Sequence, residues 1–118
     1  MKATIKISML LALCYFVFGI SNVNAQEATK TETFKVYGNC EMCKEHIEGA
    51  LKKKDGVLKK EWSPKTKMLT VTYDPSKITL TQIKQKIADV GYDTDEIHAK
   101  DETYSKLHKC CQYDRAKK

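Results

Sequence analysis

The chain has 118 residues, 42% of them hydrophobic and 31% charged, which suits one small domain with a modest core. Its formal net charge of +6 comes from lysines scattered among acidic residues, with Arg115 as the single arginine. Nucleic-acid sites concentrate Arg, Lys and aromatic residues on one face, so this pattern excludes a nucleic-acid partner. The sequence also lacks a Ser/His/Asp set and a glycine-rich phosphate loop, and we therefore predict no enzymatic activity.

The N-terminus has the features of a secretory signal peptide. Two lysines precede an apolar run over residues 7–20, which is too short to span a bilayer comfortably. Val23-Asn24-Ala25 then offers the small residues that a signal peptidase reads. We predict that residues 1–25 are removed and that the mature protein is exported, periplasmic or secreted, monomeric and without a membrane span. An uncleaved membrane anchor is the alternative.

The following segments predict a strand, a helix and a hairpin. After a polar leader over residues 26–31, alternating residues favour a strand up to Tyr37. Apolar residues at three- and four-residue spacing predict a helix over residues 43–54, with Gly56 as its stop. Residues 57–62 and 68–73 predict the two strands of a hairpin.

The remaining segments predict a second helix, a last strand and a tail. Thr79 followed three residues later by Gln82 is a capping box, which is typical of a helix start, and Gly91 closes this helix. Residues 93–99 predict a short strand. The order βαββαβ indicates an α+β, ferredoxin-like fold, a four-stranded antiparallel sheet with two helices on one face. Residues 100–118 form a cysteine-containing tail with a short helix.

Four cysteines follow the signal peptide, in two local pairs: Cys40 with Cys43, and Cys110 with Cys111. A disulfide within either pair would close almost no loop and add little stability. Cys40 and Cys43 stand where the first strand meets the first helix, and a helix N-terminus favours the thiolate. Thiolates bind soft ions such as Cu(I), Zn(II) and heavier thiophilic metals. The first pair therefore predicts a metal site.

Around this pair the sequence resembles the heavy-metal-associated (HMA) domain. The shared pattern C-x-x-C-x-x-x-I-E-x-x-L begins at Cys40, and the likeness covers roughly residues 32–99. The family includes copper chaperones, the metal-binding modules of copper-pumping ATPases and the periplasmic mercury-binding protein. The resemblance implies metal ligation by Cys40 and Cys43, with Tyr92 near the metal loop. The family usually has the pattern G-M-x-C-x-x-C. Here Gly38-Asn39-Cys40 is one residue shorter and lacks the methionine.

The chemistry of a two-thiolate site favours Cu(I) as the cargo. Two thiolates suffice for Cu(I), whereas a structural Zn(II) site usually takes four ligands. Hg(II), Zn(II) and Cd(II) are also compatible with sulfur ligands. The resemblance implies transfer or sequestration of the ion, with a metal-transporting ATPase or a metal-receiving protein as the partner.

Two questions remain open at this level. A periplasmic thiol–disulfide oxidoreductase is the alternative function, because such enzymes also place C-x-x-C at a helix start. In the tail, Cys110, Cys111 and His108 are candidate auxiliary ligands, which could close over the first pair or form a second site; a vicinal disulfide or two unpaired thiols are the alternatives. Adjacent residues in an extended chain point to opposite sides, so chelation by Cys110 and Cys111 together requires a turn.

Overall fold

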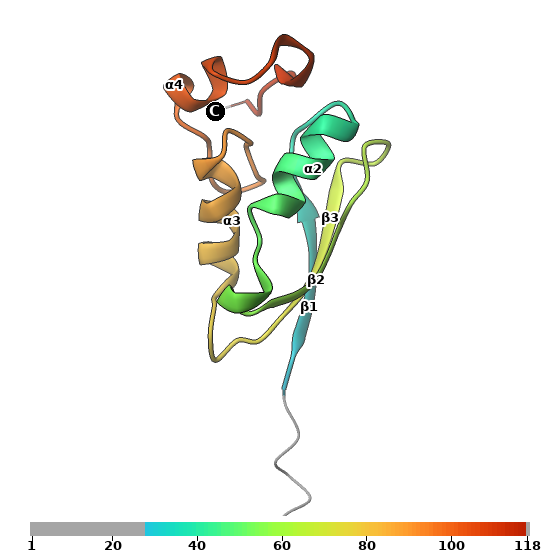
Figure 1. The fold of residues 1–118 in the computed structure, drawn as a ribbon, viewed down its shortest axis with the longest axis vertical. Coiled ribbons are helices and arrows are strands. Elements are labelled where there is room, and N and C mark those ends of the chain that lie inside the picture. Colours follow the sequence, from blue (N-terminus) through green and yellow to red (C-terminus); the bar gives the residue numbers. More distant parts are fainter. Residues whose placement is uncertain (1–27, 118) are drawn as a thin grey trace, which may run out of the picture.

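The computed structural model describes residues 28–117, so the predicted signal peptide lies outside the described residues. Two helices cover one face of a small antiparallel sheet, and the C-terminal tail lies at the end of the molecule where the first of these helices begins (Figure 1). Between residues 28 and 117, no helix is both long and apolar enough to cross a bilayer. The elements in chain order are β1 (Lys30–Lys35), α2 (Glu41–Gly49), η1 (Lys53–Asp55), β2 (Val57–Trp62), β3 (Met68–Tyr73), α3 (Leu80–Asp89), α4 (Asp101–Ser105) and η2 (Lys109–Cys111).

The sheet has the strand order β1-β3-β2, and both pairings are antiparallel. The predicted hairpin is confirmed, with Trp62 opposite Leu69 in the register. Strand β3 lies in the centre because it pairs with both β1 and β2, and its alternating residues Leu69, Val71 and Tyr73 are buried in the core. The outward positions of β1 and β3 carry threonines, whose hydroxyls pair across the two strands.

The predicted fourth strand is wrong for the described chain, which has a three-stranded sheet. Residues 93–95 do run beside the end of β1, but they form only one isolated bridge, between Val36 and Thr94. The Thr94 hydroxyl accepts hydrogen bonds from the backbone N–H groups of Glu96 and Ile97 and so folds the chain into a turn. A buried Lys84 then holds this turn through ion pairs with Asp95 and Glu96. Local polar contacts therefore replace the expected strand pairing.

Both long helices occur where the sequence predicts them. The capping box of α3 is confirmed, since the Thr79 hydroxyl and the Gln82 side chain each accept a hydrogen bond from the other residue's backbone N–H. Helix α2 ends at Gly49, five residues before the predicted end, and a short 3₁₀ turn, η1, follows. The helix ends early at Gly49 because glycine has a low helix propensity. Beyond this end, the Lys60 ammonium donates a hydrogen bond to the Leu51 carbonyl.

The core continues from the sheet and helices into the tail. Cys111 and Tyr113 are buried in the same cluster as the β3 and α3 side chains. The Tyr113 ring stacks on the Tyr92 ring, and the Tyr104 ring packs edge-on against the Tyr113 ring. The tail therefore packs as part of the domain core.

Candidate metal centre

The loop that carries the first cysteine pair lies close against Trp62. This indole is fully buried and donates a hydrogen bond to the Val36 carbonyl. A Cβ atom placed on Gly38 would lie 2.9 Å from the Trp62 ring and 3.2 Å from Cβ of Cys43. Only glycine fits here without moving the loop.

We expect Gly38→Ala to lower the free energy of unfolding by about 1–3 kcal/mol, the usual range for overpacking a core. The buried Trp62 ring cannot move away cheaply, so the loop must shift. Urea denaturation measures the change. The matched control is Gly49→Ala, because nothing lies within 4 Å of a Cβ at that helical position and alanine favours the helix by about 0.5–1 kcal/mol. Equal effects of the two substitutions would contradict the close packing of the loop.

Cys40 and Cys43 face each other at the start of α2. Cys40 is the N-cap residue, and its Sγ lies 3.5 Å from Sγ of Cys43. Both are free thiols. Cys43 is fully buried, whereas Cys40 is partly exposed. The arrangement thus combines a sheltered sulfur with one that can be reached from solvent.

The environment of Cys40 favours its thiolate. Burial by itself would raise the pKa, but hydrogen bonds from the backbone N–H of Cys43, the Cys43 thiol and the backbone N–H of Met42 outweigh it and lower the pKa of Cys40. These N–H groups belong to the first turn of α2, where they lack partners within the helix. The fold therefore favours the thiolate of Cys40, which is the form that a soft metal binds.

Asn39 lies beside the buried sulfur of Cys43. The single S–H of Cys43 can donate either to Oδ1 of Asn39 at 3.0 Å or to Sγ of Cys40 at 3.5 Å, and the Asn39 backbone N–H donates to Sγ of Cys43 at 3.5 Å. Asn39 thus contacts the buried sulfur through both its side chain and its backbone.

Tyr92 closes the inner side of the site, in agreement with the position that the sequence resemblance implies. Its hydroxyl is 2.7 Å from Nδ1 of His46 on α2. Burial, followed by the neighbouring sulfurs of Cys43 and Cys111, raises the pKa of Tyr92 strongly. Tyr92 therefore stays neutral and can donate a hydrogen bond toward a thiolate.

The tail brings a second pair of sulfurs to the same place. Residues 109–111 form the 3₁₀ turn η2, the turn that joint chelation requires, and Sγ of Cys110 lies 3.8 Å from Sγ of Cys111. The sulfurs of Cys40, Cys110 and Cys111 all lie within 4.8 Å of one another. Among the described residues, this three-sulfur group includes neither Cys43, whose sulfur is 3.5 Å from that of Cys40, nor His108, which is exposed. Burial and the adjacent thiols of Cys110 and Cys43 raise the pKa of Cys111 to about 12.

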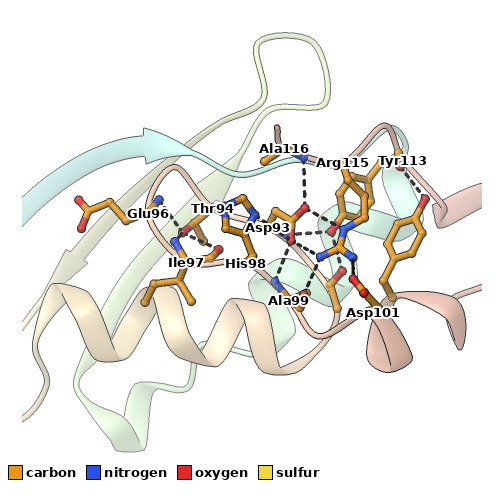
Figure 2. Close-up of polar contacts among 12 residues, drawn as sticks. Asp93, Thr94, Glu96, Ile97, His98, Ala99, Asp101, Tyr113, Arg115 and Ala116 are labelled. Carbon is orange, nitrogen blue, oxygen red and sulfur yellow. Dashed lines mark hydrogen bonds and ion pairs between the residues drawn. The ribbon is translucent and has the colours of Figure 1, made fainter. Parts of the chain in front are cut away.

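Asp93 holds the end of the tail against the domain (Figure 2). Its carboxylate is fully buried and accepts hydrogen bonds from the Arg115 guanidinium at 2.8 and 3.0 Å and from the backbone N–H of Ala99 and Ala116. Arg115 also pairs with Asp101. The Tyr113 hydroxyl donates to the Gly91 carbonyl and accepts from the Asp93 N–H. These residues form no local sequence pattern, because Asp93 and Arg115 are 22 positions apart, and they were not predicted from the sequence.

The comparisons with known proteins agree with this geometry. The family model of the heavy-metal-associated domain matches residues 33–93. A mercuric transport protein periplasmic component from Shewanella putrefaciens is 39% identical over 77 residues, covering 64% of this chain and 85% of the relative. A copper chaperone CopZ from Staphylococcus saprophyticus is 41% identical over 64 residues, covering 53% and 94%. The crystal structure of oxidised MerP from Ralstonia metallidurans matches with 32% identity and a TM-score of 0.54, covering 58% and 96%. The chain therefore belongs to the heavy-metal-associated domain family.

Proposed function

We propose that this protein binds a soft metal ion, with Cu(I) favoured, through Cys40 and Cys43, and carries or sequesters it. The observation that carries the proposal is the pair of free thiols at the start of α2, with their sulfurs 3.5 Å apart. The lowered pKa of Cys40 supports it, because the thiolate is the form that binds metal. The relatives named for copper and mercury support a thiophilic cargo.

The site is built to receive and release an ion at the molecular surface. Cys40 is partly exposed, and the exposed Met42 follows two residues later, with its sulfur 3.9 Å from Sγ of Cys110. A partner's thiolate can therefore reach the ion through Cys40 while Cys43 still holds it from the buried side. We propose a metal-transporting ATPase or another metal-receiving protein as this partner. The signal-peptide pattern of residues 1–25 supports our proposal that this exchange takes place outside the cytoplasm.

Native mass spectrometry tests both parts of this proposal. Protein from the cell envelope, purified anaerobically under reducing conditions and loaded with Cu(I), should carry one tightly held ion per chain. Its mass should correspond to a chain that begins at Gln26. A metal-free spectrum under these conditions would contradict the metal function, and a full-length cytosolic chain would contradict export.

A thiol–disulfide oxidoreductase is the second candidate, and the lowered pKa of Cys40 is the observation that favours it. The relatives named above are metal-binding and metal-transport proteins. We therefore expect no turnover in an insulin-reduction assay above that of a free dithiol. Catalysis that depended on Cys40 would reverse the order of the two candidates.

A further inference from the structure

Four sulfur atoms from two distant segments meet at one end of the molecule. Cys40 and Cys43 come from the start of α2, and Cys110 and Cys111 come from the tail some seventy residues later. The Cys40 thiol donates to the Cys110 carbonyl at 3.6 Å, so the two segments are in direct contact. All four thiols are free. The family match ends at residue 93 and does not include the second pair.

The distances between these sulfurs suit a single ion with more than two ligands. At a metal–sulfur distance of about 2.3 Å, the sulfurs of a tetrahedral site are roughly 3.8 Å apart, whereas two sulfurs on opposite sides of an ion are roughly 4.6 Å apart. The pairs Cys40–Cys43 and Cys110–Cys111 have separations of 3.5 and 3.8 Å. Cys40, Cys110 and Cys111 lie within 4.8 Å of one another, whereas Cys43, whose sulfur is 3.5 Å from that of Cys40, lies outside this group. Four-sulfur ligation therefore requires the Cys43 sulfur and the tail sulfurs to move closer together around the ion.

The tail holds its thiols in this position before any ion binds. Cys111 and Tyr113 are buried in the core, and within η2 the sulfurs of Cys110 and Cys111 lie 3.8 Å apart. The Arg115–Asp93 contacts fix the chain just beyond them. Fixing a ligand in advance removes part of the ordering cost of binding. The tail is therefore a preformed half of a site and not a loose segment that must find the metal.

We infer that Cys110 and Cys111 are metal ligands and that the docked tail converts the two-thiol loop into a four-sulfur site for a divalent d¹⁰ ion such as Zn(II) or Cd(II). Four thiolates are the usual ligand set of closed Zn(II) sites, and soft sulfur also suits Cd(II). The inference rests on the proposed function, because it takes Cys40 and Cys43 as the other two ligands. Cu(I), which two thiolates can hold, does not need the tail.

This site also implies control over release. With four sulfurs around the ion, an acceptor thiolate must first displace one of the tail ligands. Cys110 is the exposed member of the second pair, so exchange starts there, and the buried Cys111 leaves only when the tail lifts. A tightly docked tail therefore favours storage of a divalent ion, whereas Cu(I) bound by the loop alone stays transferable.

Cd(II) binding to the mature protein and to its cysteine variants tests the inference. The chemical shift of bound ¹¹³Cd and the thiolate-to-Cd(II) charge-transfer absorption both report the number of sulfur ligands. We expect four sulfurs in the wild type, three in Cys110→Ser and two in the Cys110→Ser/Cys111→Ser variant. The double variant should lose about 100-fold or more in Cd(II) affinity, beyond the losses typical of changes outside the first ligand shell. It should still bind one Cu(I) per chain.

The controls separate the inference from the proposed function. Cys110 is exposed, so Cys110→Ser tests ligation without disturbing the core, and circular dichroism checks the fold of the variant at buried Cys111. Unchanged Cd(II) affinity and sulfur count in both tail variants would overturn the inference and leave the proposed function standing. A folded tail double variant that no longer binds Cu(I) would instead contradict the proposal that Cys40 and Cys43 suffice.

Discussion

Replacing both Cys40 and Cys43 by serine is expected to abolish tight Cu(I) binding by the mature protein. The substitution removes the thiolates at the start of α2, where the backbone N–H groups of Met42 and Cys43 lower the pKa of Cys40. A serine hydroxyl stays protonated at neutral pH and is a hard oxygen ligand that Cu(I) does not prefer. Competition with a chromogenic Cu(I) chelator measures the loss, which we expect to exceed about 1,000-fold, or about 4 kcal/mol.

The fold should survive this double substitution. The buried serine at position 43 can donate to Oδ1 of Asn39, as the cysteine thiol does over 3.0 Å. The neighbouring core is formed by apolar side chains such as Ile47 and Trp62, which the substitution leaves in place. Cys110→Ser is the matched control, because it removes an exposed thiol outside the loop and should keep Cu(I) bound. An unchanged Cu(I) affinity in the Cys40/Cys43 variant would refute the proposed site.

The sequence was sufficient to predict the parts of the fold that depend on local patterns. The alternation of β3 and the capping box at Thr79 each involve residues a few positions apart, and both occur as predicted. The C-x-x-C pair is equally local, and the structure places both sulfurs at the predicted strand–helix junction. The predicted fourth strand does not form because a nearby side chain binds backbone N–H groups of the same segment. Nothing in the apolar pattern of residues 93–99 reveals that the Thr94 hydroxyl takes two N–H groups into a turn.

The second half of the site depends on contacts that no short pattern encodes. Sequence reasoning identified Cys110 and Cys111 as candidate ligands, but it left their position open and included His108, which lies outside the sulfur group of the described chain. Their position follows from an ion pair between residues 93 and 115, 22 positions apart. A buried carboxylate with a single arginine partner is recognisable only in three dimensions. The composition did hold one hint, since Arg115 is the only arginine in the chain.

Asp93→Asn is expected to release the tail and to lower the free energy of unfolding at pH 7 by about 3 kcal/mol, the lower end of the cost of breaking a buried ion pair. The Asp93 carboxylate is fully buried and accepts hydrogen bonds from Arg115, Ala99 and Ala116. Asparagine would keep the shape but lose the charge, and its NH₂ group would face donors. Arg115 would then have no buried counter-ion to hold residues 113–116 in place.

The pH dependence of this effect has a definite sign. Burial alone would raise the pKa of Asp93, but the hydrogen bonds from Arg115 and from the backbone of Ala99 and Ala116 outweigh it and lower the pKa. A carboxyl with a lower pKa in the folded than in the unfolded state stabilises the protein fully above the unfolded value of about 3.9. That contribution disappears as the pH falls through the folded value. The stability gap between wild type and Asp93→Asn should therefore be present above about pH 4 and narrow as the pH falls further.

Urea unfolding across this pH range measures the gap, and alkylation followed by mass spectrometry measures the tail itself. Cys111 is buried and its pKa is raised to about 12, so it should resist alkylation in the wild type and react in Asp93→Asn. Asp101→Asn is the matched control, because Asp101 also pairs with Arg115 but is largely exposed, and an exposed ion pair contributes less than about 1 kcal/mol. Equal effects of Asp93→Asn and Asp101→Asn would contradict the proposal that the buried Asp93 carboxylate holds Cys110 and Cys111 beside the loop of Cys40 and Cys43.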